Sequence, residues 1–156
     1  MNTKKPTEDL QQNDTIWLEL EDFKLLCFDL ARELLGQFEP IPEFVTRNPG
    51  ILESCLEVPK QTYNKELLYP SLIDQAAILF YLLIKNHPFQ NGNKRVALTS
   101  LLVFLALNNK WLKTSSTDLY KLAINVASSQ SSKKETTLNQ IKTFISDKLT
   151  ETPFSV

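Results

Sequence analysis

Two apolar segments with helical periodicity are joined by residues 87–95, which read His87-Pro88-Phe89-Gln90-Asn91-Gly92-Asn93-Lys94-Arg95. This nonapeptide holds the only histidine of the chain and one of its three glycines, and it ends on two basic residues. Histidine is the side chain type that can exchange a proton near neutral pH, and a glycine turn before a helix suits an anion. The loop therefore predicts a base and an anion cradle side by side.

The backbone of this loop follows from its proline and its glycine. Pro88 disfavours helical geometry at the residue before it, so the preceding helix is expected to end near Asn86. Helix resumes around Asn93, and the N–H groups of its first turn lack intrahelical partners and carry the positive end of the helix dipole. Gly92 would let a bulky anion approach this backbone.

The side chains of the loop suit phosphate chemistry, although each also has a plainer interpretation. Arg95 can bind phosphate oxygens in bidentate fashion, Lys94 adds a second charge, and His87 at the rim could take a proton from an attacking hydroxyl. Phe89 would anchor the loop to the core. Alternatively, His87 is only a helix-end residue, and Lys94 and Arg95 lie on a solvated face.

Composition points to one ordinary globular domain. The chain has 156 residues, 42% of them hydrophobic and 22% charged, with a net charge of −1, which gives no general attraction to nucleic acid or to an anionic membrane. Cys27 and Cys55 have no metal-type spacing and are expected to be reduced core thiols. The longest apolar run, residues 76–84, is shorter than the ~20 residues of a membrane span, and no signal peptide is visible. A cytoplasmic protein is expected.

Apolar periodicity predicts an all-α single domain. Residues 1–14 are expected to be disordered, residues 15–149 to form the domain, and residues 150–156 to be a tail. Phe23, Cys27, Leu30 and Leu34 fall on one helical stripe that Gly36 ends. The expected helices cover residues 21–35, 50–56, 72–86, 93–107, 116–127 and 138–149, and Ser71 is the expected N-cap of the third.

The proline-rich stretch between the first two of these helices cannot be helical throughout. Alternation in residues 41–45 favours a short exposed strand or hairpin there, whereas residues 60–69 are expected to be a polar connection.

Residues 87–95 resemble the signature of the Fic/Doc superfamily, H-x-F-x-[D/E]-[G/A]-N-[G/K]-R. Residues 49–56 are similar to the G-L-L-E-S-A-L segment of death-on-curing (Doc-type) toxins, and similarity extends over roughly residues 20–127. The resemblance implies a helical bundle with a short β-hairpin flap. A family flap that docks the protein target would map to Ile41, Phe44 and Arg47.

Two positions favour the Doc branch over the AMP-transferring Fic enzymes. Those enzymes carry Gly and a second Arg where this chain has Lys94 and Leu98. The Doc pattern implies transfer of the γ-phosphoryl of ATP to a hydroxyl of a protein such as elongation factor Tu. Transfer of AMP remains the alternative.

By this resemblance His87 is the general base, and Gly92, Asn93, Lys94 and Arg95 hold the phosphates. The family's Mg²⁺-binding acid is replaced by Asn91, a neutral ligand that a hard cation favours less. Asn91 leaves open weaker metal use, altered chemistry or a non-catalytic binding module. ATP and Mg²⁺ are the expected cofactors, a translation factor is the expected substrate, and a separate antitoxin is the expected regulator.

Overall fold

The computed structural model describes residues 14–35 and 40–153. Helices dominate this part of the chain, and two short antiparallel strand pairs complete it, which confirms the expected all-α class with a small hairpin. The helices are α1 (Leu20–Asp22), the π-helix η1 (Phe23–Phe28), α2 (Asp29–Leu35), α3 (Ile51–Glu57), α4 (Leu72–Lys85), α5 (Asn93–Leu107), α6 (Ser116–Ser128) and α7 (Lys134–Lys148). Short 3-10 turns are η2 (Phe44–Thr46), η3 (Val58–Lys60) and η4 (Ser131–Lys133), and the strands are β1 (Thr62–Tyr63), β2 (Glu66–Leu67), β3 (Lys110–Leu112) and β4 (Leu149–Glu151).

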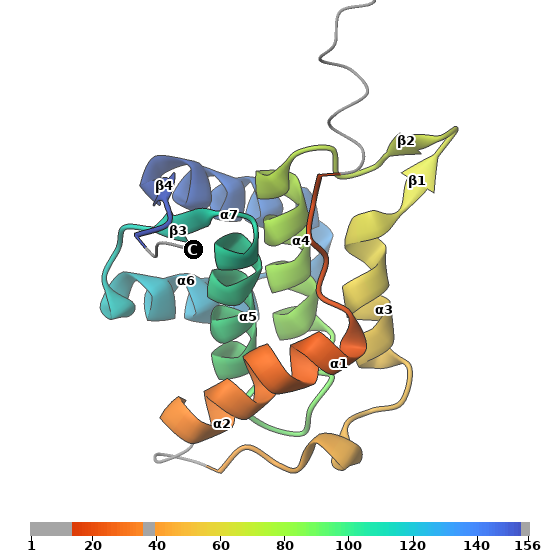
Figure 1. Cartoon of the computed structure of the whole chain (residues 1–156), viewed down its shortest axis with the longest axis vertical. Coiled ribbons are helices and arrows are strands. Elements are labelled where there is room, and N and C mark those ends of the chain that lie inside the picture. The colour runs from red at the N-terminus through yellow and green to blue at the C-terminus, as the bar shows by residue number, and fades with distance from the viewer. Residues whose placement is uncertain (1–13, 36–39, 154–156) are drawn as a thin grey trace, which may run out of the picture.

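Helices α4 and α5 pack side by side at the centre of the molecule (Figure 1). Ten consecutive residues of α4, 75–84, are buried, as its apolar faces predict. Ser71 caps α4 by accepting a hydrogen bond from the Asp74 N–H at 3.0 Å, so the predicted cap is confirmed. Asn86 is the C-cap of α4 and Asn93 begins α5, as Pro88 and Gly92 predict.

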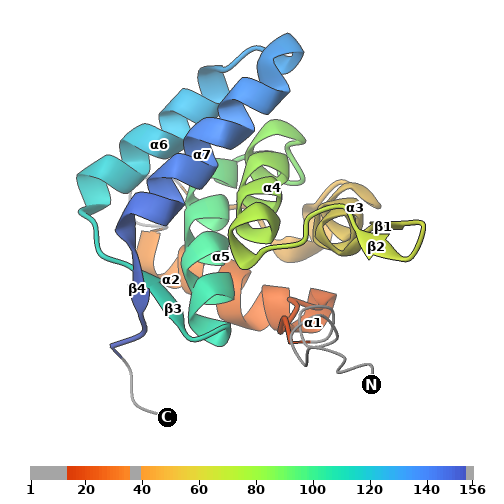
Figure 2. The same ribbon diagram turned by 90° about the horizontal axis from the view of Figure 1, so that it is seen from above.

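The other helices surround this central pair. Helices α6 and α7 lie side by side on one flank, and α3 lies on the other (Figure 2). The run from α1 through η1 to α2 crosses α5 (Figure 1). The loop between α4 and α5 is therefore held between the first helical run and the segment that precedes α3.

The first helical run buries a different face from the one that the sequence predicts. Phe23 and Cys27 are fully buried as expected, but Leu34 is 60% exposed, and Phe28 and Ala31 are buried in its place. The cause is η1, because a π-helix places more residues in each turn and so rotates the buried face by about one residue. The predicted stop at Gly36 lies outside the described residues.

The hairpin lies at a different place from the predicted one. Residues 62–67 form β1 and β2, joined by Asn64 and Lys65 with positive φ, as a tight hairpin turn requires. The predicted strand at residues 41–45 is wrong, because η2 forms there instead. The Glu43 carbonyl accepts hydrogen bonds from the Thr46 N–H and hydroxyl, at 3.0 and 2.6 Å, and these close a turn.

Both ends of the described chain attach to the region after α5. Strand β4 pairs with β3, so residues 150 and 151 of the expected tail belong to the folded domain. At the other end, the main-chain N–H and carbonyl of Ile16 bond to the Asn108 side chain, at 2.8 and 3.0 Å. In the part of the chain that the structure describes, no helix is long and apolar enough to cross a membrane.

Candidate functional site

The α4–α5 loop leaves one helix and enters the next through two left-handed residues. His87 follows the last residues of α4 with φ +48°, and Gly92 precedes α5 with φ +81°. Such a conformation is common for glycine but uncommon for the other residues as a whole. The His87 side chain is exposed. His87, the candidate base, thus has an uncommon main-chain conformation at the start of the loop.

Phe89 anchors the middle of the loop in an aromatic cluster. Its side chain is 2% exposed, and its ring centroid lies 4.9 Å from that of Phe28 and 6.4 Å from that of Phe23. Phe44 adds a fourth ring at 6.2 Å. The π-helix places Phe23 and Phe28 on the same buried face, where both rings pack against Phe89 of the loop.

Asn93 shapes the loop from inside. Its Oδ1 accepts a hydrogen bond from the Phe89 N–H at 3.0 Å, and its Nδ2 donates to the Phe89 carbonyl at 2.8 Å. The residue is 9% exposed. Both ends of its side-chain amide are therefore engaged with the loop, and phosphate contact by Asn93 would fall to its main-chain N–H.

The main chain at Gly92 lies close to the side chains of Ile41 and Arg95. A Cβ at this position would lie 2.8 Å from Ile41 Cγ1 and 3.4 Å from Arg95 Nη2. Ile41 is 3% exposed, so its side chain is packed against the loop. The glycine therefore provides both the left-handed turn and the space for the Ile41 segment.

The start of α5 opens into a groove between α5 and α6. The groove has a volume of about 610 Å³, within the ~300–1,000 Å³ of small-molecule sites. Residues 91–95 line one end, whereas Leu98 and Leu102 of α5 and Leu119 of α6 contribute apolar walls. Over the described residues, this lining does not include His87. The groove thus combines a basic helix start with an apolar interior, as a phosphorylated organic ligand requires.

Asn91 occupies the place of the expected metal-binding acid. Its Oδ1 accepts a hydrogen bond from the Gly92 N–H at 2.8 Å. Among residues 14–35 and 40–153, no three His, Cys, Asp or Glu side chains gather as a metal site would require. One neutral, already bonded amide oxygen does not fit a protein-held Mg²⁺, which prefers carboxylates.

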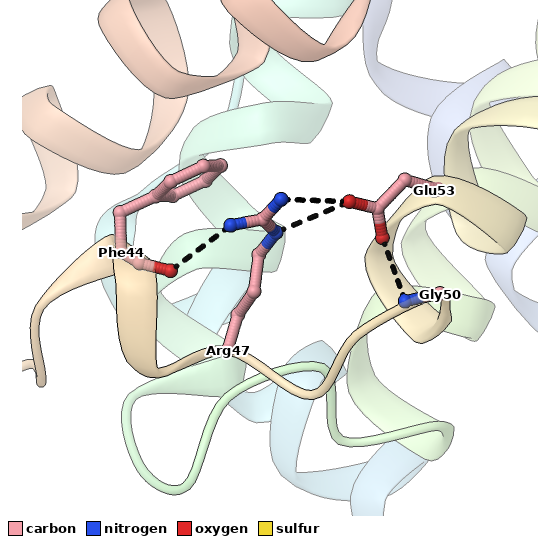
Figure 3. A network of polar contacts seen from close by, with 4 residues as sticks. All are labelled: Phe44, Arg47, Gly50 and Glu53. Carbon is pink, nitrogen blue, oxygen red and sulfur yellow. Dashed lines mark hydrogen bonds and ion pairs between the residues drawn. The ribbon is translucent and has the colours of Figure 1, made fainter.

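The residues expected to dock a target, Ile41, Phe44 and Arg47, make contacts within the protein. Arg47 pairs with Glu53 at 2.8 Å and lies over the Phe44 ring at 4.4 Å, as Figure 3 shows from close by. The Arg47 hydrogen bond holds the pKa of the Glu53 carboxyl below its usual range. Ile41, Phe44 and Arg47 therefore support the loop in this structure, and target docking by them stays a prediction.

Asn48 is a contact residue that the sequence did not single out. Its Nδ2 donates to the His87 carbonyl at 2.9 Å, and its main-chain N–H donates to the Pro88 carbonyl at 2.9 Å. An asparagine before Pro49-Gly50 indicates a turn, but nothing local indicates a partner 39 residues away. Only the fold brings Asn48 to the loop.

A sequence profile of the Fic/DOC family matches residues 17–105, more than half of the chain. The chain therefore belongs to the Fic/DOC family. Toxin Doc of Mycolicibacterium smegmatis is 36% identical over 66 residues, which are 42% of this chain and 51% of that relative. The chain thus matches about half the length of this curated relative, whose name agrees with the predicted Doc branch. No solved structure gives a significant match.

Proposed function

We propose that this chain is a Doc-type toxin of a toxin–antitoxin module that transfers a phosphoryl group from ATP to a hydroxyl of a protein target. Elongation factor Tu represents the target class, and its modification would inhibit translation. The observation that carries the proposal is the start of α5, where Gly92, Lys94 and Arg95 border a groove of about 610 Å³. His87 stands on the same loop.

The groove suits ATP at both ends. The first turn of α5 directs N–H groups and the positive end of a 15-residue helix toward an anion, and Lys94 and Arg95 add two positive charges. The apolar walls between α5 and α6 suit the base of a nucleotide. Phosphoryl transfer depends mainly on positioning and charge neutralisation, so these groups match its demands.

The chemical step assigned to His87 is proton acceptance. As the target hydroxyl oxygen forms a bond to the γ-phosphorus, the bond to the bridging oxygen breaks and ADP leaves. His87 takes the proton of the hydroxyl. Its exposure leaves room for a protein segment at the edge of the loop.

Mg²⁺ enters this proposal as the ion that accompanies ATP. It would neutralise phosphate charge while held by the phosphates themselves, because Asn91 offers only an amide oxygen that already bonds the Gly92 N–H. That bond is also the observation that favours the second candidate, a module that binds nucleotide without catalysis.

Labelled ATP tests the proposal. The protein is incubated with elongation factor Tu and ATP labelled at either the γ- or the α-phosphate, with and without an antitoxin from a neighbouring reading frame. Label is expected on the target from the γ position, and a cognate antitoxin would suppress it. Label from the α position would instead mean AMP transfer, and bound ATP with no label in either case would mean a binding module.

A matched variant sharpens the discrimination. The double variant Lys94→Gly, Leu98→Arg restores both residues of the AMP-transferring pattern, and both positions line the groove. It is expected to reduce γ-label transfer relative to the wild type. An unchanged γ-label rate would mean that these two positions do not choose which phosphate is presented.

A further inference from the structure

The main chain of His87 has an uncommon conformation. Its φ of +48° lies in the left-handed region, which is uncommon for residues other than glycine. Residues in such conformations persist where the surrounding structure enforces them, and they concentrate at functional sites. The contacts that hold His87 are therefore relevant to where its imidazole points.

Asn48 holds this part of the loop at two successive carbonyls. Its side-chain Nδ2 donates to the His87 carbonyl and its N–H donates to the Pro88 carbonyl, each at 2.9 Å. The second bond holds the peptide plane between Pro88 and Phe89, and the first holds the plane between His87 and Pro88. That plane adjoins the Cα that carries the imidazole.

Asn48 is itself fixed by the residues on either side of it. Arg47 bonds Glu53 Oε1 through Nε at 3.2 Å and through Nη2 at 2.8 Å. Glu53 Oε2 in turn accepts a hydrogen bond from the Gly50 N–H at 3.1 Å (Figure 3). The Asn48 carbonyl accepts from the Ile51 N–H at 3.3 Å, which closes the turn into α3.

We propose that Asn48 is a positioning residue that aims His87, and that the Arg47–Glu53 pair holds Asn48 in place for this purpose. The inference rests on the proposed function, in which His87 is the general base. Asn48 and His87 are both exposed, so their hydrogen bond contributes little to burial or to the core. Phe89 and Asn93 already anchor the later part of the loop. The contribution that we assign to Asn48 is therefore the direction in which the His87 imidazole points.

The single histidine makes a direct test possible. The imidazole of His87 gives one set of histidine resonances in a proton–carbon spectrum of the whole chain. The variants are Asn48→Ala, which removes the side-chain donor, and Asn48→Asp, which keeps the side-chain shape but offers a carboxylate that cannot donate. The main-chain bond to the Pro88 carbonyl is available in both variants. Asn139→Ala, at an exposed position on α7, is the matched control.

Both Asn48 variants are expected to shift or broaden the His87 resonances while the midpoint of thermal unfolding stays close to that of the control. The kcat for phosphoryl transfer is expected to fall on the order of tenfold or more, because small misplacements of a reacting group are costly. KM for ATP is expected to change by less than about threefold, since the groove is untouched.

Two results would overturn the proposal. One is that the His87 resonances remain unchanged in both Asn48 variants. The other is that they move while kcat falls no further than in Asn139→Ala. If the wild type transfers no phosphoryl group at all, the proposed function fails separately. Movement of the His87 resonances then still supports positioning by Asn48, and their constancy rejects it.

Discussion

Replacing Gly92 by alanine tests how closely the Ile41 segment packs on the α4–α5 loop. The chain contains a matched control, because Gly50 has φ +80° and Gly92 has φ +81°. A Cβ at Gly50 would meet nothing within 4 Å, whereas one at Gly92 would lie 2.8 Å from Ile41 Cγ1. Both substitutions thus share the backbone effect, and only Gly92→Ala adds a steric clash.

The magnitudes follow from these two effects. A left-handed alanine costs about 1–2 kcal/mol, partly offset by ~0.4–1 kcal/mol from the stiffer unfolded chain. Overpacking a buried contact adds about 1–3 kcal/mol, for Gly92→Ala alone. In a domain of this size 1 kcal/mol shifts Tm by ~2–4 °C, so Gly92→Ala should melt about 2–12 °C below Gly50→Ala.

Thermal and urea unfolding of both variants, alone and with Ile41→Ala, measure this difference. Ile41→Ala removes the atoms that clash, so in its background Gly92→Ala should cost no more than Gly50→Ala. Equal destabilisation by Gly92→Ala and Gly50→Ala in the protein that keeps Ile41 would refute the reasoning. It would show that the Ile41 side chain does not press on Gly92.

Three other predictions concern the same loop and the core beside it. Asn93→Ala leaves the Phe89 N–H and carbonyl without their side-chain partner. It should lower the free energy of unfolding, measured in urea titrations, by about 2–4 kcal/mol. A loss below ~0.5 kcal/mol would contradict the role of Asn93 in shaping the loop. Burial raises the pKa of the Cys27 thiol to about 12 and that of Cys55 to about 11. Both thiols should therefore resist iodoacetamide in the folded protein near pH ~8.5 and react on unfolding, and stability should fall as pH rises above the unfolded value of ~8.5. Fast alkylation of the native protein would contradict this. Asn91→Asp supplies a carboxylate and should make ATP affinity, measured by calorimetry, more dependent on Mg²⁺ than in the wild type, and an unchanged dependence would mean that position 91 does not contact the metal.

Local sequence cues were sufficient wherever a boundary depends on nearby residues. Pro88 and Gly92 correctly predicted the end of α4 and the start of α5, and Ser71 correctly predicted a cap. The nonapeptide likewise pointed to the family that the comparisons show. These features are governed by backbone sterics and by hydrogen bonds across a few residues.

Tertiary packing explains what the sequence could not show. The π-helix buries Phe28 in place of Leu34, and Phe28 packs in the aromatic cluster around Phe89. Local periodicity does not encode this packing. The contact from Asn48 to His87 joins residues 39 positions apart. The alternation at residues 41–45 favoured a strand, but among the described residues no strand pairs with this segment, and Ile41 packs on the loop instead.

The most direct measurement is the rate of phosphoryl transfer to elongation factor Tu by the wild type and by His87→Ala at saturating ATP. The mass of the target, followed over time, reports the transfer without a label. We expect His87→Ala to bind ATP as the wild type does but to transfer about 10²–10⁴-fold more slowly, as loss of a general base implies. An unchanged rate in His87→Ala would contradict the role of this loop as the catalytic centre.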